Sequence, residues 1–171
     1  ANISRTDRNT TCLPTLRHCF PGVSGRNAES GFGRLKLSAE FSLPIRVYIE
    51  DTDAGGIVYY VNYLKYLERC RTEFMRALGT DRAAISDEGW MFVVSSLALT
   101  YRQPAKLDDQ LDATAAVVAV KGAAIQFAQS VKRGSSCMVE GDVTIACVDR
   151  VSGKPRRLSP ELKQQLEARM Q

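Results

Sequence analysis

An acidic turn that leads directly into a helix pattern holds the residues best suited to chemistry. Residues 51–56 read DTDAGG, and apolar residues recur at helical spacing from about residue 61 onward. This order places the carboxylate of Asp53 close to a helix N-terminus, where backbone N–H groups are free and about half a unit of positive charge gathers. A carboxylate can act as a nucleophile or a general base, and helix N–H groups can stabilise an oxyanion. The turn therefore predicts an acyl-transfer site with Asp53 as its catalytic side chain.

Neighbouring residues of this segment have a structural as well as a functional interpretation. Gly55 and Gly56 either let the backbone approach a bound acyl group or allow positive φ in the turn. Tyr59 and Tyr60 either line an acyl pocket or pack the start of the helix. Asn62 either positions a substrate or caps and packs the helix. We keep all five as candidates for substrate binding or catalysis.

Several other kinds of site are disfavoured by the residues present. The only histidine is His18, which lies in the first 40 residues, whereas Ser-His-Asp, Cys-His and most zinc sites need an imidazole. A calcium loop that began at Asp51 would need an oxygen side chain and a glutamate where Gly55 and Asn62 stand. Cys70 has no histidine partner, so we interpret it as a buried thiol. No metal site is therefore expected.

Composition and charge indicate one globular domain of ordinary size. The 171 residues are 44% apolar, which is enough for a single core. Six of the 23 basic residues but only three of the 19 acidic ones lie in the first 40, so the remainder is nearly neutral. That balance argues against a nucleic-acid binder. The chain has no apolar run of membrane-spanning length and no secretory apolar region. Five cysteines without a CxxC pair favour reduced thiols and a cytoplasmic location.

Residues 1–41 are predicted to form a disordered or poorly ordered N-terminal extension. They are rich in Arg, Ser, Asn, Thr and Gly and show no sustained hydrophobic period. An organelle transit peptide is the weaker interpretation, because the segment contains acidic residues and lacks an amphipathic pattern. The folded domain is expected to cover 42–171.

The hydrophobic pattern of that domain predicts an α+β fold. Alternating segments indicate strands, and a long amphipathic segment indicates a helix with Tyr60, Tyr63, Cys70 and Phe74 on its buried face. Lys121-Gly122 and Gly134-Ser135 fit hairpin connections. One long helix followed by four strands predicts a helix lying on an antiparallel sheet of about five strands. The predicted strands are 45–49, 90–102, 110–120, 123–133 and 137–149, and the predicted helices are 61–78, 81–87 and 160–170.

Three strings within this domain resemble a known family. They are YIEDTDAGGIVYYVNYLKYLERCRTE at 48–73, YRQPAKLDD at 101–109 and VDRVSGKPRRLSPEL at 148–162. Together they resemble YbgC-type acyl-CoA thioesterases of the 4-hydroxybenzoyl-CoA thioesterase group, over roughly 43–165. The resemblance implies a hotdog fold, in which a curved antiparallel sheet wraps a long central helix. It also implies homodimers or homotetramers with active sites at the subunit interface.

The same resemblance implies roles for particular residues. The second aspartate of the family's signature is the essential one, which here is Asp53, and its oxyanion donor is a backbone N–H that maps to Tyr60. YbgC-type members commonly carry His at the position of Tyr60, whereas the 4-hydroxybenzoyl-CoA branch carries Tyr; the backbone N–H is common to both. The implied reaction hydrolyses an acyl-CoA to a carboxylic acid and free coenzyme A. It needs no metal or redox cofactor.

Two basic clusters are candidates for the phosphates of coenzyme A. Lys132 and Arg133 sit beside a predicted hairpin, and Lys154, Arg156 and Arg157 follow the last predicted strand. Lys and Arg bind phosphate well, although solvated surface charges are the commoner interpretation of such clusters.

A non-enzymatic protein is the alternative that the resemblance leaves open. Such a protein would be an acyl-binding or scaffold subunit associated with acyl carrier protein or the Tol-Pal envelope system. An intact Asp53 favours the enzyme. A hotdog dehydratase is disfavoured because the predicted domain lacks histidine.

Overall fold

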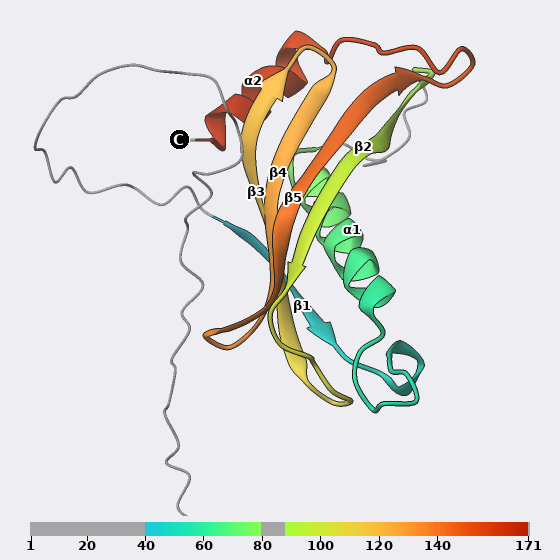
Figure 1. Cartoon of the computed structure of the whole chain (residues 1–171). Coiled ribbons are helices and arrows are strands. Elements are labelled where there is room, and N and C mark those ends of the chain that lie inside the picture. Colours follow the sequence, from blue (N-terminus) through green and yellow to red (C-terminus); the bar gives the residue numbers. More distant parts are fainter. Residues whose placement is uncertain (1–39, 80–87, 171) are drawn as a thin grey trace, which may run out of the picture.

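The computed structural model describes residues 40–79 and 88–170, which form a curved five-stranded sheet and two α-helices (Figure 1). The strands lie in the order β1-β3-β4-β5-β2, and every neighbouring pair is antiparallel. The α+β class and the five-stranded antiparallel sheet are therefore confirmed. The strands are β1 (Phe41–Arg46), β2 (Trp90–Tyr101), β3 (Gln110–Lys121), β4 (Ala124–Arg133) and β5 (Ser136–Asp149).

Tight hairpins join β3 to β4 and β4 to β5 at the predicted positions. Gly122 and Gly134 have φ of 61° and 57°, in the left-handed region that glycine adopts without steric cost. The pairing places Phe127 opposite Val143 and Val131 opposite Val139, all four of them buried. Directly opposed residues share a face of the sheet, so this face forms the core.

The helix α1 (Tyr60–Ala77) covers the core face and contacts β1, β3 and β4 (Figure 1). Its buried residues include Tyr63, Leu67, Cys70 and Phe74, as the helical spacing predicted. Tyr60 is the exception, because 56% of its surface is exposed. The first turn of α1 lies beside the last residue of β2, so the Tyr60 ring packs at the end of the sheet rather than beneath it.

The first strand covers 41–46 rather than the predicted 45–49. The N–H of Tyr48 donates to Asp51 Oδ2 at 2.9 Å, and the N–H of Asp51 donates to the Tyr48 carbonyl at 3.0 Å. These bonds turn the chain into one 3-10 turn, η1 (Ile49–Asp51). Ile49 is consequently 73% exposed, although the alternating pattern placed it in the core. A local carboxylate bond overrides the strand pattern here.

The C-terminal helix α2 (Pro160–Ala168) ends two residues before the predicted boundary. Its start follows the usual rules, since Ser159 Oγ accepts the N–H of Leu162 at 3.2 Å and Pro160 occupies the first helical position. Within residues 40–79 and 88–170, no helix is both long and apolar enough to cross a bilayer. The predicted helix at 81–87 lies outside the described residues, as does the predicted extension up to residue 39.

Candidate active site

The Asp53 loop is a tight turn held by its own hydrogen bonds. The N–H of Asp53 donates to the Ile57 carbonyl at 2.9 Å, and the Asp53 carbonyl accepts the N–H of Gly56 at 3.0 Å. Gly56 has φ of 74°, which the turn requires and glycine supplies. The side chain also takes part, because Asp53 Oδ1 accepts the N–H of Gly55 at 2.8 Å. Asp53 is exposed, and its second oxygen, Oδ2, has no hydrogen-bond partner among the described residues, so it is available.

The backbone carbonyl of Asp51 ties this loop to the start of α1. It accepts the N–H of Tyr59 at 2.9 Å and the side-chain Nδ2 of Asn62 at 2.8 Å. Asp51 and Asn62 are both buried, so water does not compete for these bonds. The backbone carbonyl of Asp51 therefore fixes the loop against the helix start. Asn62 lies inside the protein with its amide nitrogen directed to the loop.

The start of α1 is open. Tyr59 is the N-cap residue, yet its side chain makes no capping hydrogen bond. The third N–H of the helix, that of Asn62, donates to the Tyr59 carbonyl at 2.8 Å. The first N–H is that of Tyr60, and no described residue accepts a hydrogen bond from it, as is general for first helical N–H groups. A free N–H of partial positive charge therefore stands seven residues after the catalytic candidate Asp53.

Tyrosine rings surround this open helix start. The ring centroids of Tyr59 and Tyr60 are 4.7 Å apart, and those of Tyr60 and Tyr101 are 6.4 Å apart in a T-shaped arrangement. A side-chain hydrogen bond with Tyr60, and next the charge of that residue, raise the pKa of Tyr59, so its hydroxyl stays neutral. Sequence reasoning missed Tyr101. Its only signal was its place at the head of the YRQPAKLDD string.

Gly55 and Gly56 differ in why a larger residue is disfavoured at each position. A Cβ added to Gly55 would lie 3.0 Å from Asp53 Oδ1, a distance tighter than nearly all such contacts. A larger residue at 55 would therefore press on the carboxylate itself. Gly56 has open space around it, so only its positive φ restricts the residue type.

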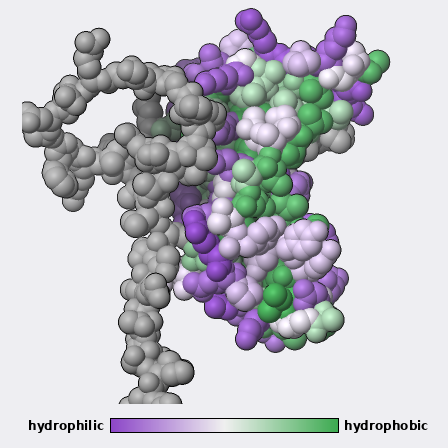
Figure 2. Space-filling model, in the orientation of Figure 1, coloured by the Kyte–Doolittle hydropathy of each residue, from purple (hydrophilic) through white to green (hydrophobic). Residues whose placement is uncertain are grey.

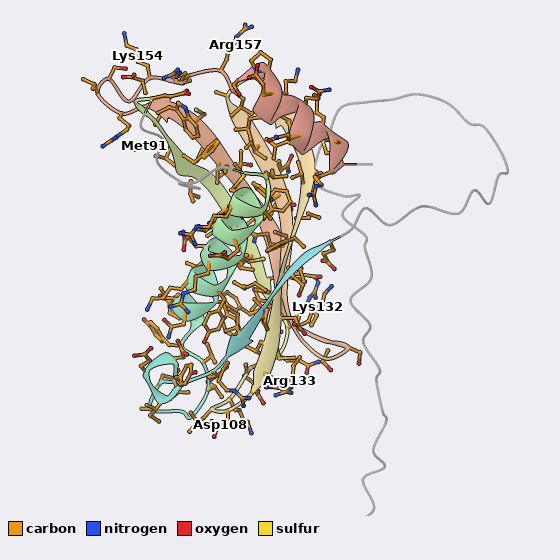
Figure 3. The ribbon with its side chains drawn as sticks, turned by 180° about the vertical axis from the view of Figure 1, so that it is seen from behind. Met91, Asp108, Lys132, Arg133, Lys154 and Arg157 are labelled. Carbon is orange, nitrogen blue, oxygen red and sulfur yellow. The ribbon has the colours of Figure 1, made fainter. Side chains whose placement is uncertain are left out.

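Lys132 and Arg133 each bind a carboxylate of the protein. Lys132 Nζ lies 3.0 Å from Glu40 Oε2, and Arg133 Nη1 lies 2.6 Å from Asp109 Oδ2. Both basic residues lie toward the same end of the molecule as Asp108, whereas Lys154 and Arg157 lie at the opposite end (Figure 3). The segment of Asp109 also contacts the chain just after the Asp53 turn, because the N–H of Val58 donates to the Ala105 carbonyl at 2.9 Å.

The interior beside α1 contains a polar network that the sequence pattern did not reveal. Arg71 is buried and its Nη1 donates to Gln129 Oε1 at 2.6 Å, while Gln129 Nε2 donates to the Leu67 carbonyl at 3.0 Å. Burial lowers the pKa of Arg71 from its ordinary value. Arg71 also lines an open cleft of about 90 Å³ between α1 and β2. The cleft lies farther along α1 than Tyr60 and does not include the Asp53 loop.

Two other side chains of α1, those of Cys70 and Glu68, have structural partners. Cys70 is fully buried, its Sγ donates to the Ala113 carbonyl at 3.1 Å, and burial raises the pKa of its thiol to about 12. A thiol of that pKa is protonated at neutral pH and is not a nucleophile. Glu68 Oε1 accepts the hydroxyl of Thr72 at 2.9 Å on the helix surface. Within residues 40–79 and 88–170, no three metal-binding side chains cluster.

Comparison with known proteins places the chain among thioesterases. A family model described as the thioesterase-like superfamily matches residues 47–166. The chain is 44% identical over 128 residues to the acyl-CoA thioesterase YbgC of Haemophilus influenzae, which covers 74% of this chain and 94% of that protein. It is 38% identical over 119 residues to the acyl-CoA thioester hydrolase YbgC of Escherichia coli, with 69% and 89% covered.

A solved structure of a probable thioesterase from Bartonella henselae is similar as well. Its identity to this chain is 34%, its TM-score is 0.63, and the match covers 70% of this chain and 98% of that one. The relatives confirm the resemblance that the three sequence strings indicated.

Proposed function

The chain belongs to the thioesterase-like superfamily, and from that premise we propose that it is an acyl-CoA thioesterase with the hotdog arrangement of sheet and helix. It hydrolyses the thioester to a carboxylic acid and free coenzyme A. One observation carries the proposal, namely that the Asp51 carbonyl ties the Asp53 loop to the open start of α1. This tie connects the loop that carries a carboxylate with an unused oxygen to a helix start that has an unused N–H.

Two routes use the same pair of groups. In the first, Asp53 Oδ2 accepts a proton from water while the water oxygen bonds to the thioester carbonyl carbon. The carbonyl oxygen gains negative charge, which the N–H of Tyr60 stabilises, and the intermediate then expels the coenzyme A sulfur, which takes the proton. In the second, Oδ2 itself bonds to the carbonyl carbon while the C–S bond breaks and coenzyme A leaves as a thiolate. Water then hydrolyses the mixed anhydride to the carboxylic acid and the Asp53 carboxylate, and the proton released in that step goes to the thiolate. Each route restores the enzyme.

The substrate-binding roles follow from position. The Tyr59 and Tyr60 rings line the approach to the carboxylate, and the small Gly55 and Gly56 keep the loop backbone accessible to the thioester. Asn62 acts indirectly, because its amide nitrogen holds the loop carbonyl of Asp51 rather than facing outward. Variants that enlarge Gly55 and change neither kcat nor KM would contradict this arrangement.

A panel of short, long and aromatic acyl-CoA substrates tests the proposal. A thiol reagent reports the coenzyme A released, and the acid product is measured in parallel. We expect turnover of at least one class, with acid and coenzyme A formed in equal amounts. A folded protein that releases no coenzyme A from any of them would overturn the proposal in favour of an acyl-carrier substrate or an acyl-binding subunit.

We propose that Lys132 and Arg133 hold the phosphates of coenzyme A, and a change in KM tests this. The double variant Lys132→Gln/Arg133→Gln is expected to raise KM by about three- to tenfold with little change in kcat, because charge-assisted contacts to phosphate are lost. Steady-state kinetics provide the measurement. Arg76→Gln is the control, since it also removes an arginine from an ion pair, with Glu73 on α1. An equal KM in the double variant and the control would exclude the role.

We propose that a second copy of the chain covers the free edge of β2. Within the described residues, β5 is the only neighbour of this 12-residue strand, so its outer N–H and C=O groups are unpaired. Its apolar residues Val94 and Leu97 lie opposite the buried Ile145 and Val143, yet are 54% and 44% exposed. Figure 2 shows apolar residues gathering in a band along this side. Exposed apolar residues on a core-facing side indicate an interaction surface.

Light scattering of the purified protein tests the pairing. We expect a dimer or tetramer mass for the wild type and a monomer mass for Leu97→Asp, because a carboxylate cannot be buried at an apolar interface without a partner. Ser96→Asp, which alters the neighbouring position on the other face of β2, should keep the wild-type mass. A monomeric wild type at micromolar concentration would refute the proposal.

A further inference from the structure

The open start of α1 needs support from outside the helix. Its N-cap residue, Tyr59, makes no side-chain capping bond, whereas Ser, Thr, Asp or Asn usually fills that task. Helix ends without caps fray. An oxyanion donor, however, must lie within about 0.5 Å of its productive position. Contacts from other segments must therefore hold the first turn in place.

Tyr101 supplies such a contact from the sheet. Its hydroxyl donates to the Tyr60 carbonyl at 3.2 Å. Its ring packs edge-on against both Tyr60 and Tyr63, with centroid distances of 6.4 and 5.9 Å. Tyr101 is the last residue of β2 and pairs with the buried Val139 of β5. The contact therefore joins the first helical turn to a firmly packed part of the sheet.

The hydroxyls of Tyr63 and Tyr101 differ in the groups that they bind. Tyr63 is buried, and its hydroxyl accepts the N–H of Ala105 at 2.8 Å, so it satisfies a backbone group of the core. Tyr101 is 47% exposed, and the carbonyl that it contacts is already one that the helix itself uses. Loss of the Tyr101 hydroxyl would leave no core group without a partner. Its contribution is to the placement of the turn rather than to the stability of the core.

We propose that Tyr101 is a positioning residue that fixes the Tyr60 N–H through its bond to the Tyr60 carbonyl. The inference rests on the proposed function, in which that N–H stabilises the oxyanion. The Asp51 carbonyl holds the helix start from the loop side, and Tyr101 holds it from β2. Burial, and next the neighbouring Tyr60, raise the pKa of Tyr101, so its hydroxyl keeps the proton that it donates.

Tyr101→Phe tests the proposal because it removes only the hydroxyl and keeps the ring contacts. We expect kcat to fall by about three- to tenfold, with KM within about twofold of wild type and an unchanged melting temperature. Backbone hydrogen exchange within residues 60–64 should become faster by a similar factor. Tyr63→Phe is the matched comparison. It removes the acceptor of the Ala105 N–H and should lower the melting temperature instead.

These measurements distinguish failure of the positioning role of Tyr101 from failure of the proposed thioesterase function. Wild-type kcat and wild-type exchange in Tyr101→Phe would overturn the positioning role while leaving the proposed function in place. A raised KM with unchanged kcat would mean that Tyr101 contacts the substrate directly, which also overturns it. A melting temperature that falls as much as in Tyr63→Phe would assign Tyr101 to stability alone. A wild-type protein without thioesterase activity would refute the proposed function, and the exchange measurement would still decide whether Tyr101 holds the turn.

Discussion

Replacing Asp53 with Asn is expected to lower kcat by about 10²–10⁴-fold while the fold stays intact. Asn keeps the Oδ1 atom that accepts the Gly55 N–H, so the loop retains its internal bond. It loses the negative charge and the proton affinity at the second position, where Oδ2 stands in the wild type. Both catalytic routes need that oxygen, either as the nucleophile or as the base. Initial rates of coenzyme A release at saturating substrate, with melting temperatures in parallel, measure the effect.

Asp108→Asn is the matched control for Asp53→Asn. It makes the same change of charge at an exposed aspartate, and φ of Asp108 is 65°, a conformation that Asn also tolerates. We expect its kcat to stay within about twofold of wild type. Similar rates for the two variants would show that the carboxylate of Asp53 has no catalytic role and would move the search to another group.

Local pattern was enough to predict most of the fold. The strands β2 to β5 have long alternating sequences with glycine at the hairpins, so their bounds differ from the predicted ones by at most one residue. The start and end of α1 follow the apolar spacing in the same way. The pattern was wrong for the first strand, which begins at Phe41 rather than Ile45 and ends before 47–49, where the Asp51 carboxylate binds the Tyr48 N–H. A side-chain bond of this kind leaves no trace in hydrophobic periodicity.

The site was harder to predict because its contacts join distant residues. Asp53 and Tyr60 came from one short string and its resemblance to a family. Tyr101 meets Tyr60 across 41 positions, and Arg71 meets Gln129 across 58, so neither contact has a local signal. Lys132 is paired with Glu40 across 92 positions, which its neighbours in sequence did not suggest. Such pairings follow from the sheet order, which periodicity does not determine.

Substituting Pro for Tyr60 removes the proposed oxyanion donor without removing the helix. Pro has no N–H, and the first helical position is the one where α-helices accept it, because the N–H there has no helical partner. The preceding residue must be extended, and Tyr59 is, with φ −61° and ψ 130°. The Tyr60 carbonyl that accepts the Tyr101 hydroxyl remains present. Loss of one oxyanion donor is expected to lower kcat by about 10²–10³-fold.

Tyr60→Ala is the control, since it also removes the ring but keeps the N–H. Any fall in kcat of Tyr60→Ala relative to wild type therefore measures the loss of the ring alone. The ratio of the two variants therefore isolates the backbone group. Melting temperatures and circular dichroism of both variants establish that α1 still forms.

In the proposed mechanism, a carboxylate and a free helix N–H, tied together through Asp51, hydrolyse the thioester. The most direct test is kcat for coenzyme A release by Tyr60→Pro relative to Tyr60→Ala, on the best substrate of the panel. We expect the Pro variant to be slower than the Ala variant by about 10²–10³-fold, with both folded. Equal rates in the two variants would contradict the mechanism, because the N–H at the start of α1 would then have no part in the reaction.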